Sequence, residues 1–424
     1  MEDTAGIRTT YGSKWFAQHV PEADSLVAGR LRATGGCLVG KTSTPHFGHK
    51  FSSDNLVAPP GRNPWKLDRT CGGSSGGAAA AVAAGLGPVA QGSDGGGSIR
   101  NPAAWCGVFG LKTTSGLVPR FPNGDFWGNS AAGPIARTVR DAALLLQVLA
   151  GPDERDPMSL RTPEEDYLAA CTGDLSGLRV VFSADLGYAP VDPEIRAIAE
   201  SAARTFADFG CTYEQRDPCW FDPAPYHKIT AMVGAHASFV DRAAEHPDWV
   251  EPSMLEQVLA GGRYSAYEYV RARGYRSRLY TEVRQFFGGC DLLLTPVMPV
   301  AAWGVEYGSE PTEIGGRATP TVVDRVPFTY LFNQTGHPAA SVPCGFTSEG
   351  LPVGLQIVGR WFAEPLILRA AACFEAARPW SQHTPRSKNS HNELTIVPEA
   401  AVPDLTTMMF SHRPSDTPVD TPTP

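Results

Sequence analysis

A chain of 424 residues with 42% hydrophobic and 19% charged residues has enough apolar side chains for a large folded core. Its net charge of −8 and its lack of a basic cluster argue against nucleic acid as a direct partner. No apolar run approaches the about 18 residues that span a bilayer, and the first residues lack the apolar core of a signal peptide. Nine cysteines, an odd number without a C-x-x-C pair, predict a reduced, cytoplasmic protein.

The first predicted helix covers residues 24–34, and residues 37–39 follow as a short buried strand. The stretch Gly35–Thr42 matches G-x-x-x-x-G-K-[ST], the sequence of a phosphate-binding loop. Such a loop needs a strand before its first glycine and a helix at its end, whereas Pro45 disfavours a helix here. We therefore interpret Gly35–Thr42 as a turn at the end of a strand. A nucleotide-binding protein is the least favoured hypothesis.

His46 and His49 follow this turn in a loop rich in glycine and proline. No carboxylate or cysteine stands at metal-ligand spacing around them, so we expect both histidines on the surface. The sequence gives no reason to expect a metal or another cofactor.

Beyond residue 130, the apolar periodicity predicts alternating helices and strands, the pattern of an α/β fold. The predicted helices cover residues 138–150, 193–209, 226–245, 265–287 and 364–377. The predicted strands cover residues 178–182, 212–215, 291–296, 339–342 and 353–358. Near the C-terminus the sequence becomes polar and rich in Pro, Ser and Thr. We therefore predict one domain over residues 1–384 and a disordered tail over residues 385–424.

The most unusual stretch is Cys71–Gly110, where two turns rich in glycine each carry serine. The turns are Gly72–Gly77 and Asp94–Ser98, and the residues between them predict a helix over 78–85 and a strand over 88–91. Glycine loses more conformational freedom on folding than any other residue, so it is retained where the backbone takes strained dihedrals or approaches another group closely. Two such turns around one helix favour a shared reaction centre over ordinary loops.

Ser98 has the setting that a nucleophilic serine needs. A serine hydroxyl must lose its proton to a base, and the oxygen that becomes negative during attack needs hydrogen-bond donors, which consecutive glycine N–H groups supply. The hydrolase motif G-x-S-x-G is not formed, because Arg100 stands at its last position. No histidine lies in a comparably constrained setting. The residues thus indicate a serine nucleophile with an unusual base.

The serine-rich stretch resembles the amidase signature family. Gly-Gly-Ser-Ser-Gly-Gly is followed by the Ser98 of Gly-Gly-Ser-Ile-Arg, 24 positions after Ser74, and then by Cys-Gly-Val-Phe-Gly-Leu-Lys. The resemblance runs from about Thr9 to Trp380 and is most specific over Gly72–Leu111. It implies a single α/β/α domain around a large mixed sheet. It also implies hydrolysis of carboxylic amide C–N bonds by a Ser–Ser–Lys triad, with a small-molecule amide as substrate and no cofactor.

The resemblance also implies roles for single residues. Ser98 would be the nucleophile that forms the acyl-enzyme. Ser74, held by a cis peptide bond after Gly73, would pass protons between Ser98 and a lysine. The expected oxyanion hole consists of the backbone N–H groups of Gly95, Gly96, Gly97 and Ser98. Residues 120–130 and 328–333 are candidate walls of the substrate pocket.

The family's catalytic lysine has no counterpart in the chain. Lys41 matches a second, non-catalytic lysine of the family, and Lys14 lies on the wrong side of Gly12-Ser13. By this alignment, the catalytic lysine would fall immediately before Met1. We therefore expect the chain of residues 1–424 to have little or no amidase activity.

Three functions compete. The favoured one is a small-molecule amidase. The second is the glutaminase component of an amidotransferase, its A-type subunit, which feeds ammonia to a mischarged tRNA through partner subunits. The third is a catalytically silent protein that binds amides or carboxylates. The sequence is compatible with a homodimer and does not identify the amide.

Overall fold

The computed structural model describes residues 1–122, 130–162 and 164–385, and residues 1–385 form one compact unit. Residues 386–424 of the predicted tail and residues 123–129 of the candidate pocket loop lie outside the described residues. All nine cysteines are described, and each is a free thiol. No helix within the described part of the chain is long and apolar enough to cross a membrane.

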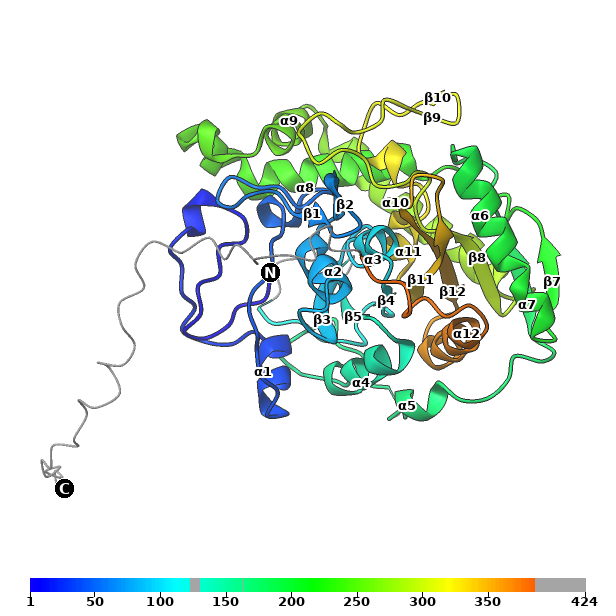
Figure 1. Cartoon of the computed structure of the whole chain (residues 1–424). Helices are drawn as coiled ribbons and strands as arrows, with labels where there is room; N and C mark the ends of the chain where they lie inside the picture. Colours follow the sequence, from blue (N-terminus) through cyan, green and yellow to red (C-terminus); the bar gives the residue numbers. More distant parts are fainter. Residues whose placement is uncertain (123–129, 163, 386–424) are drawn as a thin grey trace, which may run out of the picture. The chain divides into compact units, whose positions relative to one another are not determined.

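The fold is built on a mixed sheet of eight strands in the order β3-β5-β4-β11-β12-β8-β6-β7 (Figure 1). Neighbouring strands are antiparallel except at β8, β6 and β7, which run parallel. The eight strands are β3 (Val89–Asp94), β4 (Phe109–Lys112), β5 (Ala131–Ala136), β6 (Arg179–Phe182), β7 (Thr212–Gln215), β8 (Leu292–Pro296), β11 (Ala339–Phe346) and β12 (Pro352–Gly359). Two short hairpins pair β1 (Arg62–Asn63) with β2 (Lys66–Thr70) and β9 (Glu313–Ile314) with β10 (Arg317–Ala318).

Helices surround this sheet. They are α1 (Leu26–Ala33), α2 (Gly76–Ala83), α3 (Arg100–Cys106), α4 (Val139–Leu149), α5 (Tyr167–Ala170), α6 (Pro193–Ala203), α7 (Thr205–Asp208), α8 (Ala224–Glu245), α9 (Pro252–Gly261), α10 (Ala266–Phe286), α11 (Tyr330–Thr335) and α12 (Glu364–Ala377). Helix α8 packs against both α9 and α10, and α10 also packs against α11 (Figure 1).

Strand β12 carries helices on both faces. A Cβ atom on Gly354 would lie 2.6 Å from the Cβ of Ala104 in α3, whereas one on Gly359 would lie 3.3 Å from side-chain atoms of Ile367 in α12. Successive residues of a strand point to opposite faces, so residues five apart face opposite sides. Helices α3 and α12 therefore cover opposite faces, and the sheet is the middle of an α/β/α sandwich, as the resemblance implies.

The predicted elements beyond residue 130 are confirmed with small shifts of their ends, except that residues 193–209 form two helices, α6 and α7, which meet at Arg204. The predicted buried strand over residues 37–39 is wrong. These residues have no regular structure, and Leu38 and Val39 are 52% and 80% exposed. The short apolar run suggested a strand, but it has no strand partner within the described residues.

A small core joins the two serine-bearing turns. Alanines of α2 pack against Ile99 and Ala103 at the start of α3, with Ile135 of β5 beneath them. Side chains of this size let the two helices approach closely, which brings the turn before α2 next to the turn before α3.

Candidate active site

Ser74 lies in the turn that leads into α2, and its side chain is 4% exposed. The peptide bond between Gly73 and Ser74 is cis, as the resemblance implies. A Cβ atom on Gly73 would lie 2.8 Å from both the carbonyl oxygen of Lys50 and the amide nitrogen of Ser52. Only glycine fits here, because contacts of under 3.0 Å with backbone atoms cannot be relieved by a side-chain rotation.

Ser98 lies in the turn between the end of β3 and α3, and its side chain is 7% exposed. The neighbour of Ser74 ties the two turns together. The Ser75 N–H donates to the Ser98 carbonyl at 3.0 Å. The Ser75 Oγ also accepts from the Ser93 N–H at 3.1 Å and lies 3.2 Å from the Ser93 carbonyl. The two serines that the sequence singles out are thus brought together by Ser75, whose role the sequence did not indicate.

The turn that carries Ser98 folds around the carboxylate of Asp94. This carboxylate accepts from the N–H of Gly97 at 2.7 Å and of Ile99 at 3.1 Å, and it is ion-paired with Arg100 at 2.9 Å. Burial alone would raise the pKa of Asp94, but the charge and hydrogen bonds of Arg100 hold the pKa well below its usual range. Asp94 is therefore charged at neutral pH and forms the centre of the turn.

The backbone N–H groups of this turn do not all have the same role. Gly97, expected among the oxyanion donors, directs its N–H to Asp94. The N–H groups of Gly95, Gly96 and Ser98 have no hydrogen-bond acceptor within the described residues. These three N–H groups therefore remain available as hydrogen-bond donors.

Neither serine hydroxyl has a hydrogen-bond partner among residues 1–122, 130–162 and 164–385. The two lysines weighed in the sequence analysis have other contacts: the Lys41 Nζ donates to the Thr4 Oγ1 at 2.9 Å, and the Lys14 Nζ donates to the Asp248 carbonyl at 3.2 Å. The described residues therefore do not assign a base to Ser74.

The segment 328–333, a candidate pocket wall, does contact the serine turn. A Cβ atom on Gly96 would lie 3.8 Å from the Cβ of Tyr330 and 3.5 Å from the Cζ of Phe51. The Asn333 Nδ2 donates to the Asp94 carbonyl at 2.6 Å. Aromatic side chains thus border the glycines that carry the free N–H groups.

Sequence reasoning missed three buried polar residues that hold Arg100. The guanidinium donates to the Thr329 carbonyl and to the side chains of Asn333 and Gln356, at 2.7–3.0 Å. A signal for them exists: Thr329 and Gln356 interrupt apolar runs and Asn333 ends one, and a buried polar side chain needs a hydrogen-bond partner.

Of the two histidines predicted on the surface, His49 is partly exposed and His46 is buried. His46 is 1% exposed and packs against Trp15 and Phe47, so the prediction is wrong for His46. Burial lowers the pKa of His46 to about 4, which keeps the ring neutral at pH 7. Within the described residues, no group of three or more His, Cys, Asp or Glu side chains could hold a metal ion.

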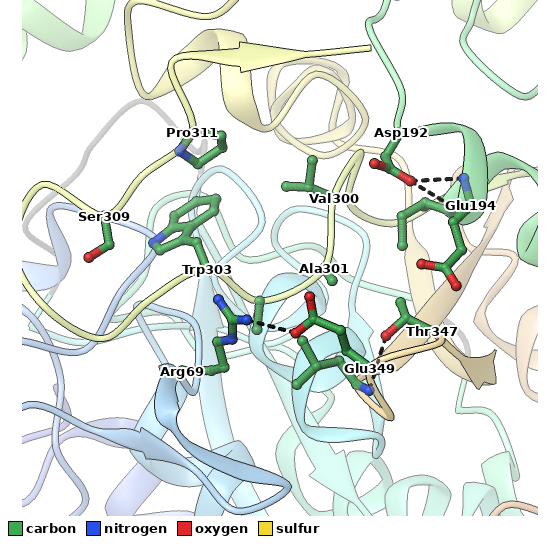
Figure 2. Close-up of a pocket in the computed structure, with 13 residues that line it drawn as sticks. Arg69, Asp192, Glu194, Val300, Ala301, Trp303, Ser309, Pro311, Thr347 and Glu349 are labelled. Atoms are coloured by element: carbon green, nitrogen blue, oxygen red, sulfur yellow. Dashed lines mark hydrogen bonds and ion pairs between the residues drawn. The ribbon is translucent and has the colours of Figure 1, made fainter.

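A cavity of about 260 Å³ lies away from the two serines. Figure 2 shows its walls, which include Trp303, the ion-paired side chains of Arg69 and Glu349, and Glu194. Trp303 packs on Trp105 at the C-terminal end of α3, whereas Ser98 precedes the N-terminal end of the same helix. The cavity is therefore separate from the candidate active site.

The fold and the comparisons with known proteins together define an amide-hydrolysing enzyme. The family profile described as Amidase matches residues 2–368, and the chain belongs to this family, the amidase signature enzymes. It is 40% identical over 387 residues to an acylamidase of Rhodococcus erythropolis, covering 90% of this chain and 80% of the relative. It is 36% identical over 411 residues to the A-type subunit of the glutamyl-tRNA(Gln) amidotransferase of Thermosynechococcus vestitus, covering 90% and 83%.

Solved structures agree. A bacterial aryl acylamidase of the amidase signature family superposes with a TM-score of 0.83 at 32% identity, over 89% of this chain and 81% of that one. The substrate complex of 6-aminohexanoate cyclic dimer hydrolase also gives a TM-score of 0.83, at 30% identity over 91% and 84%. The family resemblance and the α/β fold expected from the sequence are confirmed.

Proposed function

We propose that the protein hydrolyses a small carboxylic amide through an acyl-enzyme on Ser98. The observation that carries the proposal is the junction of the two turns, where the Ser75 N–H donates to the Ser98 carbonyl beside three N–H groups without an acceptor among the described residues. In the proposed reaction, the Ser98 Oγ attacks the amide carbon and the C–N bond breaks. The Ser98 proton passes through the Ser74 hydroxyl to a base and then to the departing amine. Water releases the acid by the reverse sequence.

The proposed oxyanion hole consists of the N–H groups of Gly95, Gly96 and Ser98. Each donor of this kind is worth about 10²–10³ in rate when it is aimed at the developing charge. Gly97, whose N–H is bound to Asp94, belongs to the proposed site through its backbone conformation.

Acylamides are the first substrates to test, because the R. erythropolis relative is an acylamidase and the superposed bacterial structure is an aryl acylamidase. The aromatic ring of Phe51 and the Cβ of Tyr330 beside Gly96 fit a substrate with an apolar group next to its amide. We also propose a cytoplasmic location, because free thiols persist in a reducing compartment and all nine cysteines are free.

A fluorophosphonate probe tests the proposal because it reacts covalently with activated serines. The sequence predicts little or no amidase activity for residues 1–424, so labelling is the main readout: we expect mass spectrometry to find the label on Ser98 in wild type, and labelling and any measurable anilide hydrolysis to be lost in Ser98→Ala. Ser201→Ala, at an exposed position of α6, is the matched control and keeps the wild-type rates. A wild-type protein that binds anilides but is never labelled at Ser98 would instead be a silent binder.

The glutaminase function of the A-type amidotransferase subunit is the second candidate, because several curated relatives at 34–36% identity carry that name. Glutamine and acetanilide offered to the same preparation separate the two functions. Ammonia release from glutamine that exceeds anilide hydrolysis would favour the glutaminase.

A further inference from the structure

The peptide unit between Gly96 and Gly97 is held at both of its polar atoms. Its carbonyl oxygen accepts from the Thr329 Oγ1 at 2.6 Å, and its N–H donates to the Asp94 Oδ1 at 2.7 Å. Because a peptide unit is planar and rigid, two hydrogen bonds on opposite edges fix the direction of its plane. Asp94 belongs to the same turn, but Thr329 comes from a segment more than 200 residues away in the chain.

The Thr329 hydroxyl has one proton and two nearby acceptors. Its distance to the Gly96 carbonyl is 2.6 Å and its distance to the Val326 carbonyl is 3.3 Å, so the proton belongs to the bond with Gly96. Thr329 is itself fixed, since its side chain is fully buried and its carbonyl accepts from the Arg100 Nη1 at 3.0 Å.

The space around this hydrogen bond is closed. Gly97 has a φ of +133°, and a Cβ atom on it would lie 2.5 Å from the Thr329 Oγ1. The contact therefore needs both a glycine at position 97 and a hydroxyl at position 329.

We propose that Thr329 is a positioning residue for the oxyanion hole. By holding the Gly96 carbonyl, it turns the N–H of Gly97 to Asp94 and leaves the N–H groups of Gly95, Gly96 and Ser98 for the anionic oxygen. The inference rests on the proposed role of Ser98, but the arrangement of the turn can also be measured without any reaction.

Two substitutions separate the hydroxyl from the shape of the side chain. Thr329→Val keeps the shape and removes the hydroxyl, whereas Thr329→Ser keeps the hydroxyl. Thr335→Val is the matched control, because Thr335 is a buried threonine of α11 whose hydroxyl also has two hydrogen-bond partners, the Leu331 carbonyl at 3.1 Å and the His337 Nδ1 at 2.9 Å. All variants are first compared by melting temperature.

The chemical readout is the rate constant for labelling of Ser98 by the fluorophosphonate, together with kcat and KM for an anilide. We expect Thr329→Val to lower the labelling rate and kcat by about 10–100-fold with little change of KM. Thr329→Ser and Thr335→Val are expected to stay within about threefold of wild type. If labelling rate and kcat fall equally in all three variants, and in proportion to the fall in melting temperature, Thr329 has only a packing role.

The structural readout is hydrogen exchange of the Gly97 amide, followed by NMR on protein labelled with ¹⁵N-glycine. We expect slow exchange in wild type and Thr329→Ser, and exchange at least about tenfold faster in Thr329→Val. Unchanged exchange in Thr329→Val would overturn the inference. If wild type is never labelled at Ser98, the proposed function fails, and the exchange measurement still decides the role of Thr329.

Discussion

Asp94 and Arg100 form an ion pair of 2.9 Å in which both side chains are fully buried. Asp94 ends β3 and Arg100 begins α3, so the pair closes the turn that carries Ser98. The remaining donors of Arg100 reach Asn333 in α11 and Gln356 in β12. One guanidinium therefore connects the candidate nucleophile to parts of the fold that lie more than 200 residues away in sequence.

The first prediction concerns this pair. Asp94→Asn keeps the shape but leaves the Arg100 charge buried without a counter-charge, which is expected to lower the free energy of unfolding by about 3–5 kcal/mol. The pKa of Asp94 is lower in the folded protein than in the unfolded chain, so its stabilisation is present above the unfolded pKa of about 3.9 and is lost as the pH falls below it. Urea unfolding of both proteins at pH 7 and pH 3 should show a difference that shrinks at low pH.

The control for Asp94→Asn is Glu200→Gln, which removes the carboxylate of the exposed pair with Arg204 on α6. We expect no measurable change in unfolding there, because exposed pairs contribute little. An Asp94→Asn protein as stable as wild type at pH 7 would contradict the importance of the buried charge.

The second prediction compares two glycines. Gly97→Ala places a methyl group 2.5 Å from the Thr329 Oγ1 at a φ of +133°, so labelling of Ser98 should fall by about 10²-fold or more. Gly234→Ala, inside α8, meets no atom within 4 Å and should stabilise the protein by about 0.5–1 kcal/mol. Both predictions are checked by measuring the melting temperature and the rate of Ser98 labelling for each variant. Labelling of Gly97→Ala at the wild-type rate would show that the turn tolerates a side chain.

The two serines could be found in the sequence because their signal is local. Each lies in a glycine-rich turn, and the spacing of the turns is diagnostic of the family. The partners of Arg100 could not be found in this way, since a hydrogen bond from α3 to Asn333 or Gln356 depends on strand order in the sheet. Only the polar character of these residues within or at the end of apolar runs pointed to them.

The failed predictions have a related cause. Residues 37–39 are apolar and resemble a strand, but a strand needs a neighbour, and the pattern of one segment does not supply it. His46 lies in a loop of glycine and proline, yet the loop folds back and the ring is buried against aromatic side chains. In both cases, burial was decided by segments distant in sequence.

The third prediction concerns Lys112, a fully buried lysine at the end of β4. Burial, followed by repulsion from Arg100, lowers the pKa of Lys112 to about 7, although Asp94 and Glu364 attract its charge. Between about pH 7 and the unfolded pKa of about 10.4, the unfolded chain binds a proton that the folded protein does not. The contribution of Lys112 to the free energy of unfolding therefore rises with pH between about 7 and 10.4.

Lys112→Met removes this dependence while keeping most of the side-chain volume. We expect the variant to be more stable than wild type near pH 7, by roughly 2–4 kcal/mol, with the difference vanishing near pH 10.5. Unfolding by urea at four pH values between 7 and 10.5 measures both curves. If the free energies of unfolding of wild type and Lys112→Met change in parallel with pH, Lys112 stays charged in the folded protein.

The fourth prediction separates the neighbours Ser74 and Ser75. The Ser74 hydroxyl has no hydrogen-bond partner within the described residues, so Ser74→Ala should leave stability nearly unchanged. If Ser74 relays the proton, the same substitution should lower amide hydrolysis by at least about 10²-fold. Ser75→Ala instead leaves the Ser93 N–H without its acceptor, which is expected to lower the free energy of unfolding by about 1–3 kcal/mol.

The two variants should therefore lose different properties, one the reaction and the other stability. Ser74→Ala is expected to keep its melting temperature and lose the reaction, whereas Ser75→Ala is expected to lose stability and retain a larger share of the reaction. An ester with a good leaving group sharpens the comparison, because its leaving group needs no proton and its hydrolysis should depend less on Ser74 than amide hydrolysis does. A Ser74→Ala protein that loses ester and amide hydrolysis equally, together with its melting temperature, would show that Ser74 holds the turn and does not relay a proton.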